Sequence, residues 1–425
     1  MPNDRTEAKP DAERVDPSGA SQTEEPPDAP QHDGSGEAAP TRRPRGPWRR
    51  PFQTALSVWG AATLAYFSIN VLVWMLRSES GPLLSGMLEV WNRWDTGHYT
   101  TIATTGYNPQ TENTAFFPLY PVLIRLSDPV LPGGALSAGL IISHAACIAA
   151  LTVLYRLTGE LLGEDVAQRT VFYLMAFPFA FFLVAAYNES LFLLFSVSAL
   201  YCMRRGYWWT AGWLGLLASA TRQAGLLLAL AFAVEYLRQR GWKLNRVRWN
   251  ALAVGLVPLG VVAYAVFLWR AFGDPLKFVH VQALWGREAS WPWEGTVRAI
   301  EVIRKASVDG YIFQPLVIMN VIDILAVVVT GVLLVLSVVG RWRLGTQSLF
   351  IVAWAAASYL MVVVSPIGLD VPLHSTPRYV LETLPAFMVV AQMGRNEHLH
   401  RLYLVPAIAV QGVLVLGYFN NIWLA

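Results

Sequence analysis

The sequence predicts an all-α protein that crosses a membrane many times, and two observations point to this fold class. Only 14% of the residues are charged and 54% are hydrophobic, whereas soluble chains carry about 25% charged residues. Apolar runs of roughly 18 to 25 residues also recur from Phe52 onward, and each is long enough to cross about 30 Å of hydrocarbon. Between these runs we find no stretch with the composition of a soluble folded domain.

About eleven membrane-spanning helices are expected. The expected spans are 52–76, 137–157, 166–186, 189–203, 207–221, 223–238, 250–271, 316–339, 346–366, 379–394 and 402–423. The count is open at 207–238, which could form a tight hairpin of two short helices or one long helix. The long connections 77–136 and 272–315 mix aromatic and charged residues, which is typical of helices that lie in the headgroup layer.

The first part of the chain has a different composition. Residues 1–41 are rich in Pro, Asp, Glu, Ser, Gly and Gln and nearly lack large apolar side chains, so they cannot bury enough surface to fold. A basic cluster follows directly before the first apolar run: Arg42, Arg43, Arg45, Arg49 and Arg50. We therefore expect residues 1–50 to be a disordered cytoplasmic tail and residues 51–425 to be one transmembrane domain.

The arginines of the short connections agree with this orientation. With a cytoplasmic N-terminus, the inside connections are 158–165, 204–206, 239–249, 340–345 and 395–401. All but the first are plainly basic, as short cytoplasmic loops are. The two long connections and the short loop 367–378 then face outside. We expect a multi-pass protein of the plasma membrane with its active site on the outer face.

The polar residues 94–99 (Trp-Asp-Thr-Gly-His-Tyr) stand out just after the first apolar run. A charge at that depth is costly unless it has a partner or a function. If residues 88–107 form one helix, a single face carries Trp91, Asp95, His98, Tyr99 and Ile102. A carboxylate beside aromatic rings suits a carbohydrate acceptor. A surface helix anchored by its aromatic residues, with Asp95 merely solvated, explains the same spacing equally well.

Residues 116–121 read Phe-Phe-Pro-Leu-Tyr-Pro. The two prolines predict that no regular helix runs through this segment. We expect a turn that leads into a re-entrant or short helical piece, whose apolar residues, Tyr120 among them, could line a lipid chain. An ordinary proline-rich connector is the alternative.

Charged residues also lie at the outer margins of three later spans. Glu189 opens the fourth span, where it complements the helix dipole. Arg222 stands within an apolar run and needs an anion, which Glu189 or a ligand phosphate could supply. His374 and Arg378 precede the tenth span, and the planar fork of arginine suits phosphate. A structural salt bridge competes with ligand binding for each arginine taken alone.

Several familiar catalytic motifs are missing from the sequence. It has no glycine-rich phosphate loop, no Gly-x-Ser-x-Gly turn, no Cys/His spacing suited to zinc and no paired-carboxylate cluster of a metal–diphosphate sugar site. This argues against a cytosolic nucleotide-sugar enzyme and favours a substrate presented from the membrane. We expect no cofactor, no required metal and no nucleic-acid partner.

Taken together, the motifs resemble the PIG-V family of mannosyltransferases, in the membrane-embedded GT-C class. The resemblance rests on Trp94-Asp95-x-x-His98-Tyr99-x-x-Ile102-Ala103-x-x-Gly106-Tyr107, Phe116-Phe117-Pro118-x-Tyr120-Pro121, Phe177-Pro178, Tyr187-x-Glu189-Ser190-Leu191-Phe192, Ala218-Ser219-Ala220-Thr221-Arg222-x-x-Gly225 and, more weakly, Pro377-Arg378-Tyr379. These matches spread in order over most of residues 88–380. The N-terminal tail and residues 272–315 carry no motif of the family.

The resemblance implies a GT-C-like helical bundle that transfers mannose from a polyprenyl-phosphate donor on the outer face, with inversion at the anomeric carbon. It implies that Asp95, in the first outside loop, is the catalytic base. The residues expected to bind substrate are Trp91, His98, Tyr99, Tyr120, Tyr187, Glu189, Arg222, His374 and Arg378. The eukaryotic members act on glycosylphosphatidylinositol precursors. Because the positive charge of this chain is almost all arginine, we expect a bacterial homologue with a different glycolipid, glycan or protein acceptor.

Two other functions compete with this one. A flippase or transporter of a polyprenyl-linked sugar would also need arginines for phosphate, but it should carry polar residues along a path through the membrane midplane. A catalytically inactive partner of another transferase would have no activity alone.

Overall fold

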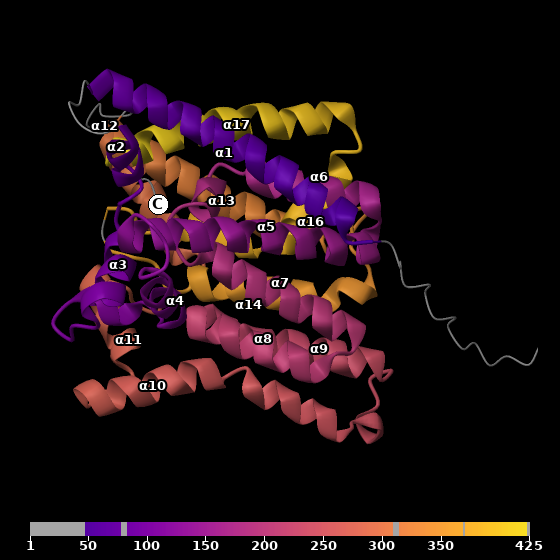
Figure 1. Cartoon of the computed structure of the whole chain (residues 1–425). Coiled ribbons are helices and arrows are strands. Elements are labelled where there is room, and N and C mark those ends of the chain that lie inside the picture. Colours follow the sequence, from indigo (N-terminus) through magenta and orange to yellow (C-terminus); the bar gives the residue numbers. More distant parts are fainter. Residues whose placement is uncertain (1–46, 78–82, 309–313, 369, 423–425) are drawn as a thin grey trace, which may run out of the picture. The chain divides into compact units, whose positions relative to one another are not determined.

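The structure is a computed structural model that describes residues 47–77, 83–308, 314–368 and 370–422. Its elements within those ranges are all helices, without a β-strand (Figure 1). The expectation of an all-α fold is therefore confirmed. The expected disordered tail lies almost wholly outside the described residues, and so does most of the basic cluster; Arg49 and Arg50 begin the first helix.

Five helices are long and apolar enough to cross a membrane. They are α1 (Arg49–Arg77), α5 (Gly134–Leu162), α13 (Pro315–Leu336), α14 (Leu349–Val363, preceded by η7, Thr346–Ser348) and α17 (Glu397–Phe419). A sixth span results if η5 (Trp249–Leu256) and α10 (Leu259–Phe272) are counted together, with a bend of 42° between them. Pro258 sits at this bend, where it cannot donate the hydrogen bond that a continuous helix needs.

The remaining predicted spans correspond to shorter helices. These are α6 (Glu164–Ala176, followed by η2, Ala180–Leu183), α7 (Glu189–Arg205), α8 (Trp208–Thr221), η3 with α9 (Gln223–Leu227 and Leu228–Gln239) and η8 with α16 (Val380–Glu382 and Leu384–Met393). Every predicted span thus coincides with a helix or a pair of short helices. By length and composition only five or six qualify as membrane spans, so the count of eleven is not confirmed.

Residues 207–238 form the hairpin, not one long helix. Arg222 leaves α8 in an extended conformation, with φ −154°. Trp208, at the start of α8, packs on Phe232 and Tyr236 near the end of α9, with ring centroids 5.0 and 4.7 Å apart. The two helices therefore run antiparallel, and the reversal between them falls at Arg222.

The connections at one end of the bundle are partly helical. The first contains α2 (Leu83–Glu89), α3 (Asp95–Thr105), η1 (Glu112–Ala115) and α4 (Leu119–Ser127); the second contains α11 (Lys277–His280), η6 (Val281–Trp285) and α12 (Glu294–Val308); the third contains α15 (Thr376–Tyr379). Figure 1 shows α2, α3, α11 and α12 together at the left of the view.

One local prediction for the first connection is wrong and another is confirmed. Residues 88–107 do not form a single helix, because the chain turns at 90–94 and α3 begins only at Asp95. No helix runs through the whole 116–121 segment, as expected, although α4 begins inside it at Leu119. Pro121 is accepted there because the first turn of a helix has no hydrogen-bond partner for its N–H groups. The expected short helical piece after the turn is present.

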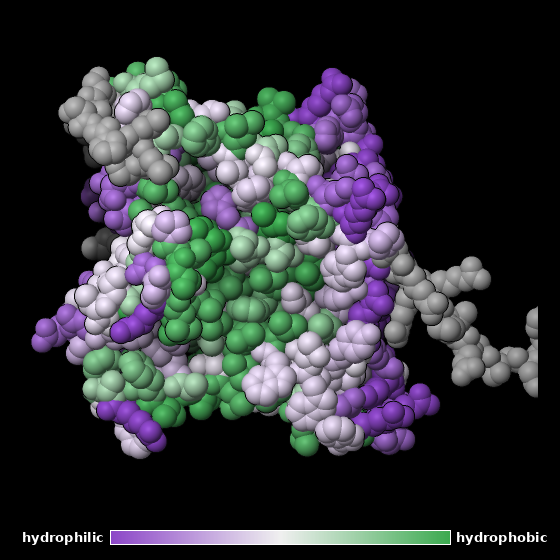
Figure 2. All heavy atoms as spheres, in the orientation of Figure 1, coloured by the Kyte–Doolittle hydropathy of each residue, from purple (hydrophilic) through white to green (hydrophobic). Residues whose placement is uncertain are grey.

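Polar residues gather at two ends of the molecule, and a hydrophobic band separates them (Figure 2). The five connections predicted to face the cytoplasm lie together at one end. They are joined by the contacts Gln239–Met203, Arg205–Glu160, Gln347–Leu161 and Arg395–Asp165. The start of α1 is there too, because the ring of Trp48 lies 5.7 Å from that of Tyr201. α2, α3 and α12 are at the other end (Figure 1).

Small residues allow close helix packing where α8 meets η5 and α10. A Cβ atom on Gly260 would overlap Ser219 Oγ and the backbone of Leu216 and Ala220. Gly212 of α8 approaches the carbonyl of Ala253 in the same way. Such glycines are typical of membrane helices that associate by backbone contact. This packing fixes the end of α8, and with it the position of Arg222.

We predict that Gly260→Ala lowers the thermal stability of the purified protein in detergent, because the added methyl group has no space. Overpacking of this kind costs about 1–3 kcal/mol. Gly255→Ala is the matched control, since a Cβ atom there meets nothing within 4 Å. Equal melting temperatures for the two variants would show that α8 and α10 are not tightly packed at Gly260.

Candidate functional site

Five charged side chains meet at the end of the bundle that carries α3. Each lies at or near a helix end: Asp95 begins α3, Glu189 begins α7, Arg222 follows α8, Arg378 lies in α15 and Glu382 ends η8. Helix ends leave backbone N–H and C=O groups without a partner in the helix. Polar side chains are therefore more easily accommodated there than along the apolar sides of the helices. Elements far apart in the sequence therefore bring their charges to one place.

The five residues form one chain of alternating charge. Arg378 Nη1 donates to Asp95 Oδ2 at 2.7 Å, and Arg378 Nε lies 3.1 Å from Glu189 Oε1. Arg222 Nη1 lies 3.1 Å from Glu382 Oε1 and 3.6 Å from Glu189 Oε1. Glu189 thus links the two arginines. We call these five residues the charge network.

The charge network is largely shielded from solvent. The side chains of Glu189 and Glu382 are 4% and 6% exposed and that of Arg378 is 8% exposed. Asp95, at 15%, is the most accessible member. Removing one partner from such a buried set leaves an uncompensated charge. The stability of the network therefore depends on all of its members, and its most solvent-accessible point is Asp95.

Aromatic rings surround the two guanidinium groups. The ring of Tyr379 lies 4.6 Å from the Arg222 guanidinium and 5.3 Å from that of Arg378. The rings of Phe182 and Tyr187 lie 5.5 and 5.4 Å from Arg378. These cation–π contacts fix the orientation of both arginines. Tyr187 also ties α3 to the network, because its hydroxyl donates to the Arg93 carbonyl at 3.2 Å.

The backbone is strained shortly before both partners of the closest ion pair in the charge network, Asp95 and Arg378. Trp94 precedes Asp95 with φ +43°, and Ser375 precedes Arg378 by three residues with φ +65°. Such values are unfavourable for residues other than glycine and persist only where surrounding contacts enforce them. The Trp94 ring packs edge-on against Tyr418 at 5.1 Å, which supplies one such contact.

The aromatic residues expected around Asp95 have different environments. His98 stacks on Phe116, with ring centroids 4.5 Å apart, and stays partly accessible. Tyr99 and Tyr120 are buried against each other. The Tyr120 hydroxyl donates to the Gly139 carbonyl at 2.9 Å. His98 thus keeps an accessible edge, whereas the two tyrosines pack the interior.

Trp91 does not share a helical face with Asp95, contrary to the prediction. It lies in the turn before α3 and packs against Tyr418 and Phe419 of α17, with ring centroids 5.9 and 4.9 Å away. The reason is the break at Trp94, which ends any continuation of α3 toward the N-terminus. Trp91 therefore holds the turn in place from the side of the last helix.

His374 is buried in the loop before α15, at 9% exposure. Burial, with the nearby positive charges of Arg378 and Arg287, lowers the pKa of His374 to about 4. Its imidazole is therefore neutral at pH 7. A neutral ring beside the network can donate or accept a hydrogen bond without adding charge.

Sequence reasoning missed three residues at this site. Glu382 is the nearest carboxylate to Arg222, and Tyr379 contacts both arginines. Arg287, in the second long connection, acts electrostatically on both His374 and Tyr379. The Pro377-Arg378-Tyr379 motif could have flagged Tyr379, but Glu382 looks like an ordinary helix-start residue.

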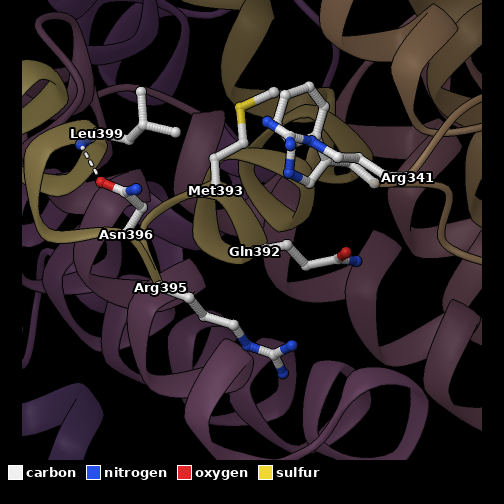
Figure 3. Close-up of a pocket in the computed structure, with 7 residues that line it drawn as sticks. Arg341, Gln392, Met393, Arg395, Asn396 and Leu399 are labelled. Atoms are coloured by element: carbon white, nitrogen blue, oxygen red, sulfur yellow. Dashed lines mark hydrogen bonds between the residues drawn. The ribbon is translucent and has the colours of Figure 1, made fainter.

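A pocket lies at the opposite end of the bundle (Figure 3). Its lining comes from the α13–α14 and α16–α17 connections: Arg341, Trp342, Gln392, Met393, Arg395, Asn396 and Leu399. Asn396 Oδ1 accepts from the backbone N–H groups of His398 and Leu399, which caps α17. This pocket belongs to the end with the basic connections and is separate from the charge network.

The acidic residues of the network do not form an evident metal site. Within the described ranges, no group of three or more His, Cys, Asp or Glu side chains is arranged to hold a metal ion. In the network itself, two arginines stand between three carboxylates. Asp95 is the most accessible of these carboxylates.

Comparison with known sequences identifies the segment that carries three of these charges. Residues 76–257 match the family model described as mannosyltransferase (PIG-V). This segment is similar to the PIG-V mannosyltransferases, and we call it the PIG-V segment. The PIG-V segment includes Asp95, Glu189 and Arg222, while Arg378 and Glu382 lie beyond it.

Curated relatives match a similar stretch. GPI alpha-1,6-mannosyltransferase 2 of Cricetulus griseus is 36% identical over 155 residues, which is 34% of this chain and 31% of the relative. The proteins of the same name from Mus musculus and Homo sapiens are each 30% identical, over 35% and 34% of this chain and 32% and 31% of their own length. The match thus spans about a third of these relatives.

Two solved structures are similar over a larger part of the chain. ArnT from Cupriavidus metallidurans bound to undecaprenyl phosphate has a TM-score of 0.47 and 14% identity, covering 85% of this chain and 76% of that one. The archaeal oligosaccharyltransferase AglB from Archaeoglobus fulgidus, in complex with an inhibitory peptide and a dolichol-phosphate, has a TM-score of 0.40 and 14% identity, covering 87% and 56%.

We predict that Arg378→Met destabilises the protein by about 3–5 kcal/mol, because Asp95 loses its arginine partner and Glu189 loses one of its two. The loss is measured as a lower melting temperature in detergent. Arg395→Met, whose side chain is 60% exposed and lies 3.6 Å from Asp165, should change it little. If both variants melted like the wild type, the ion pairs of the charge network would not hold this end together.

Proposed function

We propose that this chain is a membrane-embedded mannosyltransferase of the GT-C type. It would move mannose from a polyprenyl-phosphate donor to a glycolipid, glycan or protein acceptor on the outer face of the membrane, with inversion. Asp95 would act as the general base. The observation that carries the proposal is an accessible carboxylate held by a buried arginine at one polar end of an apolar helical bundle.

The family match supports the reaction class. The PIG-V segment contains Asp95 and two further members of the charge network. Curated relatives that match this segment are named GPI alpha-1,6-mannosyltransferase 2. On this basis we propose that this chain also transfers a sugar to a glycolipid.

The geometry of Asp95 supports its role as base. One carboxylate oxygen accepts a hydrogen bond from Arg378 at 2.7 Å, which holds the group in place. The other oxygen makes no hydrogen bond to a described residue and can accept the proton of an acceptor hydroxyl. Glu189 Oε2 is also buried without a hydrogen bond. A sugar hydroxyl could donate to it, which would favour a bound sugar at this place.

The proposed reaction is a single displacement. The acceptor oxygen attacks the anomeric carbon as the bond from that carbon to the phosphate oxygen breaks. The electron pair of the broken bond leaves with the lipid phosphate, and Asp95 takes the acceptor proton. Positive charge near the departing phosphate lowers the barrier. A lipid phosphate is a good leaving group, so this chemistry does not itself require a metal or cofactor.

The distribution of basic residues supports an external site. The connections rich in arginine lie together at the end of the bundle opposite the charge network. Short connections with excess Lys and Arg stay in the cytoplasm. The charge network would then face the outside. A donor whose lipid tail lies in the membrane could reach it along the hydrophobic band (Figure 2).

One observation favours the transporter as a second candidate. The buried face of α13 carries a row of polar residues along its length: Asn320, Asp323 and Thr330. Asp323 is 2% exposed, and its Oδ2 makes no hydrogen bond within the described ranges. Ionisable residues inside membrane helices often mark transport paths. Such a row is what a midplane path for a polar headgroup would need.

A reaction in detergent separates the two candidates, because no bilayer exists there across which lipid could move. We predict that purified protein transfers labelled mannose from polyprenyl-phosphate-mannose in detergent, and that Asp323→Asn leaves this turnover unchanged. Absence of transfer in detergent, together with flux in vesicles that Asp323→Asn abolishes, would establish a transporter instead.

We predict that Asp95→Asn lowers kcat about 10² to 10⁴-fold, the usual contribution of a positioned general base. The amide keeps the shape of the carboxylate but cannot accept the proton. Asp128→Asn, at the next aspartate along the chain, serves as the control and should keep full activity. If the Asp95 variant turns over like the wild type, at equal expression and melting temperature, Asp95 is not the general base.

A catalytically inactive partner of another transferase would show no transfer at all, either as the wild type or as either variant.

A further inference from the structure

The charge network has no surplus of positive charge. Three carboxylates, those of Asp95, Glu189 and Glu382, face the two guanidiniums of Arg222 and Arg378, and each guanidinium lies within 4 Å of two carboxylates. An anion that approaches the network therefore meets at least as much negative as positive charge. The lipid phosphate of the proposed donor needs another cation before it can bind here.

Arg287 is the cation that the fold brings to this place. It follows η6 and Gly286, whose φ is +66°. Gly368 donates from its backbone N–H to the Trp285 carbonyl at 3.3 Å, and Ser290 donates in the same way to Val364 at 2.8 Å. The segment around Arg287 is thus held against the loop that leads to His374 and Arg378.

A second contact joins this segment to α3. The ring of Trp285 packs edge-on against Phe116 at 6.1 Å, and Phe116 stacks on His98. The connection that carries Arg287 therefore touches both sides of the site: the Asp95 helix through Phe116, and the Arg378 loop through Gly368. The influence of its charge on His374 and Tyr379 agrees with this position.

The guanidinium of Arg287 does not pair with a carboxylate in the part of the chain that the structure describes. No ion pair joins it to a residue in the described ranges, and its Nε is buried without a hydrogen bond. Its side chain is partly exposed. Arg93, another arginine at this end without an ion pair to a described residue, also has a buried Nε without a hydrogen bond, but its Nη1 donates to the Asn92 carbonyl at 3.4 Å. Arg287 is thus available to a ligand on the Arg378 side of the site.

We propose that Arg287 binds the phosphate of the lipid-linked donor. The inference rests on the proposed function, because it assigns the ligand of the same site. Arg287 would supply the positive charge that the charge network lacks, from a connection that carries none of the family motifs. Its planar fork can donate two parallel hydrogen bonds to phosphate oxygens. Arg287 is a binding residue in this account and takes no part in the proton transfer.

Binding of a labelled polyprenyl phosphate to the purified full chain in detergent tests the proposal without catalysis. Arg287→Ala should weaken this binding roughly 10- to 100-fold, the effect of losing a hydrogen bond to a charged group. Arg287→Lys should restore much of the affinity because it keeps the charge. Arg304→Ala is the matched control: Arg304 is an exposed arginine of α12 in the same connection, and its loss should not change binding.

Kinetics provide a second measurement. Arg287→Ala should raise the KM for the donor by a similar factor, with the KM for the acceptor and the melting temperature unchanged. The proposal is overturned if Arg287→Ala binds polyprenyl phosphate like the wild type, or if Arg304→Ala weakens binding equally.

The same assay separates failure of this inference from failure of the proposed function. If the wild type binds polyprenyl phosphate no better than the uncharged polyprenol, the phosphate-linked donor itself is wrong, and both proposals fall. If the wild type prefers the phosphate and Arg287→Ala retains that preference, only the role of Arg287 is wrong.

Discussion

Charges at the end of an apolar helical bundle must be paired, and this requirement governs how one end of the molecule is built. The ion pair between Asp95 and Arg378 is part of a chain in which carboxylates and guanidiniums alternate. Each member comes from a different helix end, so the helices must finish at the same level for the charges to meet. The stability of this end and the accessibility of Asp95 therefore depend on the same contacts.

Irregular backbone occurs where the bundle lines this site. Arg222 is extended between α8 and η3, and Trp94 and Ser375 have positive φ shortly before Asp95 and Arg378, respectively. If the helices continued regularly through these positions, the charged side chains of the network would not meet. In a membrane protein, non-helical backbone is tolerated where it is buried in protein or lines a polar cavity. These breaks in the helices allow polar side chains from several elements to point toward one site.

The sequence predicted the helices well because apolar runs of spanning length are a strong local signal. It also predicted that Arg222 needs an anion and that Glu189 is a candidate, since an arginine in an apolar run requires one. The pairing of Arg222 with Glu382 was not predictable, because nothing local in Leu381-Glu382-Thr383 marks a partner so distant in sequence. The turn at Trp94 was missed because packing on Tyr418 enforces it. Arg287 was overlooked because its place depends on the docking of Trp285 against Gly368.

The Asp95–Arg378 pair joins residues 283 positions apart in the chain. During synthesis, Asp95, Glu189 and Arg222 all emerge long before their remaining partners. Until α15 is made, two carboxylates share a single guanidinium, and the unfinished bundle carries an unneutralised charge at its polar end. Synthesis of α15 and η8 is thus the event that closes this end, so a product truncated before them would keep an unpaired buried charge.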